Sequence, residues 1–98
     1  MNRLSQTKAI QVTTTTAEIV ARAVNRVALT IGPPLSDSVT LYPASSGTIT
    51  SGQGFNLLPN GGPLTITRET HGDLVQSAWR AVSATASVYV GVAEIFEV

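Results

Sequence analysis

The C-terminal stretch of residues 86–98 constrains the fold more than any other segment. Its sequence, ASVYVGVAEIFEV, is rich in β-branched residues and alternates at period two, which is typical of a long β-strand. One face of this strand carries Val88, Val90 and Val92, and the other carries Tyr89, Gly91 and Ala93. A strand of this length needs partners on both edges, so a chain of 98 residues must be nearly all strand or must borrow partners from another copy.

Shorter alternating segments with turn residues between them precede this strand. They recur at the 8–12-residue spacing of a sandwich or barrel, in the segments KAIQV, RVALTI, SVTLY, GTIT and LTIT. Pro43 ends one of them, and LPNGGP is the strongest turn signal in the chain. The sequence therefore predicts an all-β fold, a small antiparallel β-sandwich or barrel that is jelly-roll-like, formed by residues 17–98. Residues 1–6 lack periodicity, and we expect residues 1–16 to form an extended N-terminal arm.

Two segments allow alternative interpretations. Residues 17–24 fit either a short helix capped by Thr16 or a strand at 18–20 followed by a turn that ends at Asn25. In the last strand, the inward phase of the valines would place Glu94 in the core and Ile95 outside. A β-bulge near Ala93 would restore the phase, or the strand would leave its own domain there and pack against a neighbour.

The composition excludes several classes of function. Only 12% of the residues are charged and the formal net charge is zero, so the chain lacks the cationic face that nucleic acids or anionic membranes require. A surface so poor in charge associates easily, which favours a protein that is covered in a larger assembly. The chain contains no cysteine, and its first residues lack the apolar core of a signal peptide. No apolar run approaches the ~20 residues of a transmembrane helix, and we expect a protein that stays in the cytoplasm or in a particle assembled there.

Catalytic and metal-binding motifs are weak in this sequence. His71 is the only histidine and stands between Glu69 and Asp73, but Gly72 favours a turn that would separate these side chains. Ser77 lacks the context of a catalytic nucleophile. The segment RETHGD, residues 68–73, is therefore interpreted as a polar hairpin tip that faces solvent or contacts a partner, and we expect no enzyme activity and no cofactor.

Trp79 is the only tryptophan and separates two hypotheses. If Trp79 is buried, it is the largest residue of the core, which its apolar neighbours favour. If it is exposed, it could join Tyr42 and Phe55 in stacking on a glycan or on a host surface.

The order of these segments resembles a family of small bacteriophage virion proteins. The resemblance covers residues 19–95 and rests on Asn25-Arg26, Leu29–Ile31, Gln53-Gly54, Pro59–Gly62, Gly72-Asp73, Trp79, Ala81 and Val88–Glu94. Gly32-Pro33-Pro34 departs from the pattern, which usually has polar residues there. Such proteins are similar to capsid decoration (cement) proteins and to subunits associated with heads or tails.

The resemblance implies a structural protein of the virion surface that binds the major capsid protein and stabilises the shell as a homo-oligomer, with a trimer expected. Subunits of a head-tail joint, tail or fibre, or a glycan-binding module, are the alternatives. The arm could add a strand to a neighbour's sheet with Ile10 and Val12 as apolar anchors. The exposed tip would offer Arg68, Glu69 and His71 to a partner. These five residues are the candidate partner-binding residues of the sequence.

Overall fold

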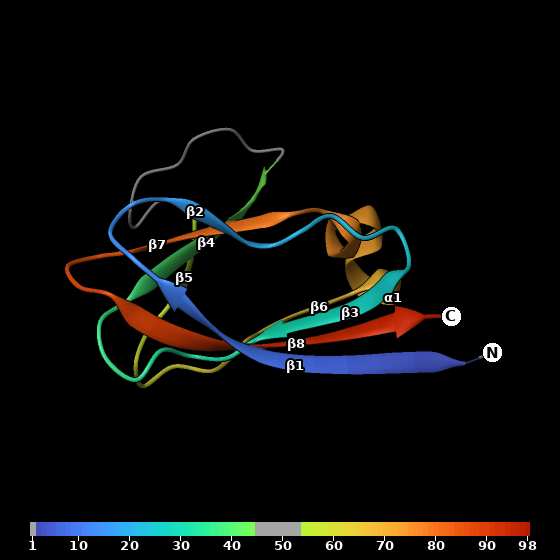
Figure 1. The fold of residues 1–98 in the computed structure, drawn as a ribbon, viewed down its shortest axis with the longest axis horizontal. Coiled ribbons are helices and arrows are strands. Elements are labelled where there is room, and N and C mark those ends of the chain that lie inside the picture. The colour runs from blue at the N-terminus through green and yellow to red at the C-terminus, as the bar shows by residue number, and fades with distance from the viewer. Residues whose placement is uncertain (1, 45–53) are drawn as a thin grey trace.

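The computed structural model describes residues 2–44 and 54–98, which form a sandwich of two antiparallel four-stranded sheets (Figure 1). The first sheet has the strand order β1-β8-β3-β6 and the second has the order β2-β7-β4-β5. The elements are β1 (Arg3–Val12), β2 (Ala17–Val20), β3 (Arg26–Ile31), β4 (Val39–Pro43), β5 (Phe55–Leu57), β6 (Leu64–Thr67), α1 (Arg68–His71), the 3₁₀ helix η2 (Gly72–Gln76), β7 (Trp79–Ser83) and β8 (Val88–Glu97). The all-β sandwich predicted from the sequence is confirmed. The expected strand at residues 47–50 lies outside the described residues.

Strand β8 lies inside the first sheet and has partners on both edges. Its ten residues pair with β1 from Val12↔Val88 to Arg3↔Glu97, and its other edge pairs with β3. The chain therefore supplies both partners that the long C-terminal strand requires.

The expectation that residues 1–16 form an extended N-terminal arm is wrong. Residues Arg3–Val12 form β1, which is paired with β8 over its full length, and Val12 is buried in the core. Residues 1–6 showed no periodicity because most of β1 is exposed on both faces, so its pairing depends on main-chain hydrogen bonds that a hydropathy pattern does not reveal. The boundary between an arm and a domain at residues 16 and 17 is therefore not observed.

The two open alternatives of the sequence are resolved. Residues Ala17–Val20 form the strand β2, followed by a turn at Val24 and Asn25, so the strand interpretation is confirmed. Neither alternative for Glu94 is observed: β8 pairs with β1 without a register shift at Ala93 and Glu94, and it stays within its own sheet to Glu97. The irregularity lies instead in β3, between Arg26 and Ala28.

Glu94 keeps its inward position because a buried arginine faces it. Arg26 Nε lies 3.2 Å from Glu94 Oε2, and both side chains are almost completely buried. Burial lowers the pKa of the Arg26 guanidinium, and the charge of Glu94 opposes that shift. The guanidinium also donates to the carbonyl oxygens of Val75, Ser77 and Ala21, and so joins β3 to η2 and to the loop after β2.

The remaining core is apolar and lies between the two sheets. Trp79 is fully buried, as the sequence favoured, and its Nε1 donates to the carbonyl oxygen of Leu74 at 3.3 Å. The core cluster consists of Val12, Ile19, Val20, Leu29, Ile31, Val39, Leu41, Leu57, Ile66, Val75, Trp79, Ala81, Val88, Val90 and Val92. The polar segment 68–73 is a helical turn rather than a hairpin tip, and Gly72 ends α1 with a positive φ of 61°.

Candidate functional site

The solvent-facing side of the first sheet carries side chains of one kind. The register places alternate residues of each strand on this side, and in β3, β6 and β8 their neighbours along the strand point into the core. We call this surface the outer face. Its central residues are Ser5, Thr7 and Ala9 of β1, Gly91, Ala93 and Ile95 of β8, Ala28 and Thr30 of β3, and Thr65 and Thr67 of β6. The same register adds Arg3 and Glu97 at one end of the face and Gln11 and the exposed Tyr89 at the other.

Between its charged end at Arg3 and Glu97 and its aromatic end at Tyr89, the outer face has uncharged and mostly small side chains on all four strands. Its central strands carry Thr30 opposite Ala93, and Thr30 Oγ1 lies 3.5 Å from Thr65 Oγ1. Small side chains leave the surface flat, and hydroxyl groups at intervals can hydrogen-bond to a partner. Such a surface fits another protein better than it fits a small molecule, which requires a concave site.

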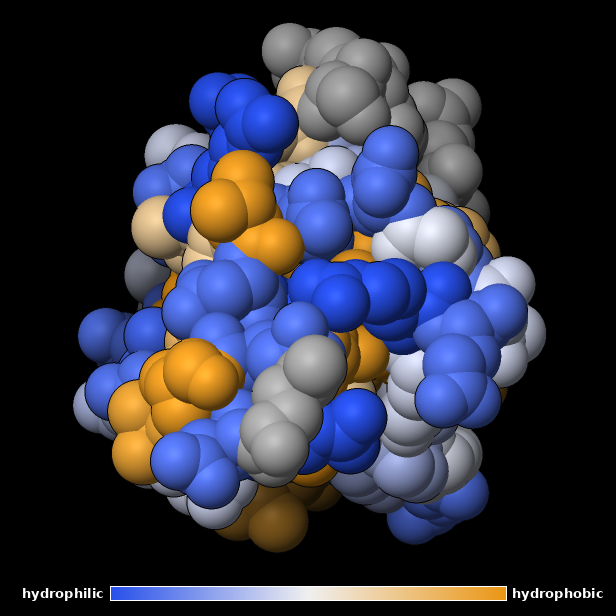
Figure 2. Space-filling model, turned by 90° about the vertical axis from the view of Figure 1, so that its right-hand side faces the viewer, coloured by the Kyte–Doolittle hydropathy of each residue, from blue (hydrophilic) through white to orange (hydrophobic). Residues whose placement is uncertain are grey.

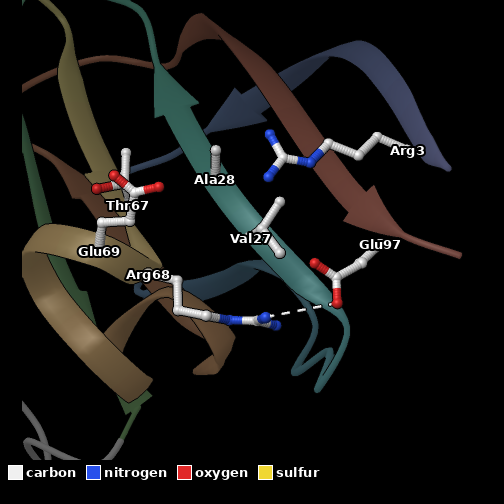
Figure 3. A pocket seen from close by; sticks show the side chains of 7 residues that line it. All are labelled: Arg3, Val27, Ala28, Thr67, Arg68, Glu69 and Glu97. Carbon is white, nitrogen blue, oxygen red and sulfur yellow. Dashed lines mark ion pairs between the residues drawn. The ribbon is translucent and has the colours of Figure 1, made fainter. Parts of the chain in front are cut away.

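A shallow pocket of about 340 Å³ lies at the end of the outer face where the termini meet (Figure 3). Val27, Ala28 and Thr67 form its small-residue part, and Arg3, Arg68, Glu69 and Glu97 surround it with charge. Arg68 Nη1 lies 3.7 Å from Glu97 Oε1, and both side chains are partly exposed. The pocket offers two cationic and two anionic groups, so it can form ion pairs with either charge on a partner.

The structure unites two of the five predicted site residues and separates the others from them. Arg68 and Glu69 both line this pocket. His71 is exposed on the same helical turn, where its Nδ1 accepts a hydrogen bond from the Thr67 amide. Val12 lies in the core, and Ile10 is partly buried and packs against it, so both side chains belong to the chain's own sandwich.

Sequence reasoning missed Arg3 and Glu97 as members of the pocket. They stand at opposite ends of the chain, and the pairing Arg3↔Glu97 brings them together. The sequence showed only a charge near each end of the chain, and the antiparallel pairing of the first strand with the last, which brings the two charges together, was not detectable from it.

The aromatic platform expected for a glycan-binding module does not form as proposed. Trp79 and Tyr42 are buried, and only Phe55 is about half exposed, with its ring centroid 5.8 Å from that of Trp79. On the end of the molecule that carries the termini, hydrophobic side chains form separate patches among polar ones (Figure 2).

The described part of the chain has neither a candidate metal site nor a helix that could cross a membrane. Residues 2–44 and 54–98 contain no group of three or more His, Cys, Asp or Glu side chains placed to hold a metal ion. Over the same ranges, none of the helices has the length and hydropathy needed to span a bilayer.

Comparison with known proteins shows similarity of fold without similarity of sequence. No protein-family model and no curated protein matches the chain. The chain is similar to a solved structure of a Bacillus endospore appendage, from a family described as disulfide-linked pili, with a TM-score of 0.59 and 9% sequence identity. The match covers 98% of this chain and 88% of that one. At this identity the likeness shows the fold alone: the chain is a small β-sandwich of a kind that also occurs in a pilus-like structural protein.

Proposed function

We propose that this chain is a non-catalytic structural protein of a bacteriophage virion, a decoration (cement) subunit that binds the major capsid protein and stabilises the head shell. The observation that carries the proposal is the uncharged centre of the outer face, which spans all four strands of the first sheet. The segment order of the chain, which resembles small virion proteins, supplies the identity of the partner.

The physical mechanism is stabilisation by mass action. A subunit that binds the assembled shell, and not its dissociated capsomers, lowers the free energy of the shell in proportion to the logarithm of its free concentration. The outer face would lie against the capsomers. The charged pocket at its end, which includes Arg68 and Glu69, would fix the orientation of the subunit on the shell, because a wrong orientation would bring like charges together there.

The test is co-sedimentation with empty shells of the major capsid protein encoded in the same genome. Thr30→Arg places a long cation at the centre of the outer face and should abolish binding. Thr14→Arg adds the same charge in an exposed loop outside that face and should leave binding unchanged. Circular dichroism melting of both variants confirms that the fold is retained. Equal binding by the two variants, or no binding by the unmodified protein, would reject the proposal.

A second candidate function is a subunit of a tail, a fibre or another filament. The similarity to a pilus-like appendage favours it, although the chain has no cysteine and so cannot form the disulfide links described for those pili. Electron microscopy of the concentrated protein separates the two candidates, because a filament subunit should polymerise alone and a decoration subunit should remain a small oligomer until shells are added.

A further inference from the structure

The edge of the first sheet at β1 exposes a regular row of main-chain groups. The Val98 amide donates to the carbonyl oxygen of Asn2, which identifies the even-numbered residues of β1 as those that exchange hydrogen bonds with β8. The odd-numbered residues therefore direct their N–H and C=O groups away from β8. These residues are Arg3, Ser5, Thr7, Ala9 and Gln11. Among the described residues, β8 is the only strand paired with β1, which runs along the outside of the sheet (Figure 1).

This edge lacks the features that usually keep an edge strand unpaired. Natural edges are kept short, or they carry proline, a bulge or an inward-pointing lysine. β1 is ten residues long, contains no proline or glycine, and pairs with β8 without a bulge. Its one inward lysine, Lys8, lies 3.5 Å from Glu94 Oε1, so its charge is balanced within the chain.

We propose that β1 pairs antiparallel with β1 of a second copy of this chain, across a two-fold axis at Thr7. A second β1 is the occupant that fits, because the other described edge strands, β2, β5 and β6, have four, three and four residues. With the two-fold axis at Thr7, each of the five outward-directed residues of β1 lies opposite an outward-directed residue of the partner. Arg3 then faces the partner's Gln11, Ser5 faces the partner's Ala9, and Thr7 faces the partner's Thr7. This pairing forms about ten main-chain hydrogen bonds.

The side chains on the inward face also complement one another in this register. Leu4, which is 56% exposed in the single chain, comes opposite the partner's Ile10 in a pair whose side chains are close. Gln6 comes opposite the partner's Lys8, so no two like charges meet. The register therefore covers an exposed leucine at the edge and brings no electrostatic penalty.

The expected product is a two-fold dimer with one sheet continuous across both copies. Such a contact is isologous and closes on itself, so it gives an even-numbered assembly in place of the trimer that the sequence resemblance implies. The inference requires self-association alone and does not depend on capsid binding, so the shell co-sedimentation test and the tests below can fail separately.

Cysteine cross-linking tests the register directly, because the chain has no cysteine of its own. Thr7→Cys should form a disulfide-linked dimer on mild oxidation, since directly opposite Cα atoms lie about 5.5 Å apart, within disulfide range. Ser5→Cys and Ala9→Cys should each remain uncross-linked alone and should form a heterodimer when mixed. Rapid cross-linking of Ser5→Cys alone, or none by Thr7→Cys, would overturn the register.

A proline substitution tests whether the edge itself makes the contact. The amide of Thr7 points away from β8, so Thr7→Pro removes an outward donor and no hydrogen bond within the chain. Light scattering should give twice the chain mass of 10.2 kDa for the unmodified protein and for the control Thr7→Val, and the monomer mass for Thr7→Pro. A trimer or a monomer in the unmodified protein, or a dimer that persists in Thr7→Pro with a native circular dichroism spectrum, would refute the proposal.

Discussion

Replacing Glu94 by glutamine should destabilise the fold strongly, because Glu94 is one partner of a buried ion pair. The substitution conserves shape and removes the negative charge that faces Arg26 at 3.2 Å. Arg26 cannot lose its own proton at neutral pH, and its guanidinium is held by the carbonyl oxygens of Val75, Ser77 and Ala21. In Glu94→Gln, the buried guanidinium of Arg26 therefore keeps only neutral hydrogen-bond acceptors and has no negative charge beside it.

The magnitude follows from the burial of the pair. Removing one partner of a buried ion pair costs about 3–5 kcal/mol, because the remaining charge loses its compensation. We expect about 3 kcal/mol, at the lower end, because three carbonyl oxygens still solvate the guanidinium. A domain of this size loses roughly 4–8 °C in Tm for each kcal/mol, so Tm should fall by about 12–24 °C.

Urea denaturation followed by circular dichroism measures this change, with Glu97→Gln as the matched control. Glu97 pairs with Arg68 at 3.7 Å, but both side chains are partly exposed, so its loss should cost less than about 1 kcal/mol. Both variants remove one negative charge from the same strand. If they lose equal stability, the charge of Glu94 is not compensating a buried cation, and the reasoning is refuted.

Three further predictions follow from burial and hydrogen bonding. Trp79→Ala should cost about 3–5 kcal/mol, and the unmodified protein should show the blue-shifted emission of a buried indole; emission typical of water-exposed indole would contradict it. Deleting residues 1–13 should lower Tm, because Val12 leaves the core and β8 loses an edge partner, and an unchanged Tm would restore the arm hypothesis. Hydrogen bonds from the Thr85 and Ala86 amides lower the pKa of Asp37, so its contribution to stability is present above the ordinary value of 3.8 and is lost as the pH falls through the lowered value. The Tm difference between the unmodified protein and Asp37→Asn should accordingly shrink below that pH, and a constant difference would disprove the assignment.

The strands that alternate cleanly were predictable because burial on one side imposes period two. In β6, Ile66 is buried and Leu64 packs against the core as expected; in β4, Val39 and Leu41 are buried as expected, although Thr40 and Tyr42 on the other side of that strand are buried as well. Within the candidate site, the sequence found Arg68 and Glu69 because charge is concentrated in their segment. It could not place Arg3 and Glu97 beside them, because that contact depends on the pairing of the first strand with the last.

The sequence left the path of β8 at Glu94 open for a related reason. A carboxylate in an inward phase predicts a bulge if no partner for it is known, and its partner Arg26 is separated from it by most of the chain. The ion pair makes the inward position tolerable, so β8 runs without interruption to Glu97 and pairs along its whole length with β1.

Because β8 is fully paired within the chain, the strand available for self-association is the N-terminal strand β1 and not the C-terminal strand β8. The sequence indicated that residues 86–98 need partners on both edges, and the chain provides them from β1 and β3. Because β8 has both partners within the chain, β1 lies at the edge of the sheet. The odd-numbered residues of β1 therefore have unpaired main-chain groups. The same Glu94 that keeps β8 regular also balances Lys8, the residue that would otherwise repel a second strand at this edge. The buried ion pair and the open edge are therefore physically linked, and Glu94→Gln should impair folding and also weaken the two-fold pairing by leaving Lys8 uncompensated.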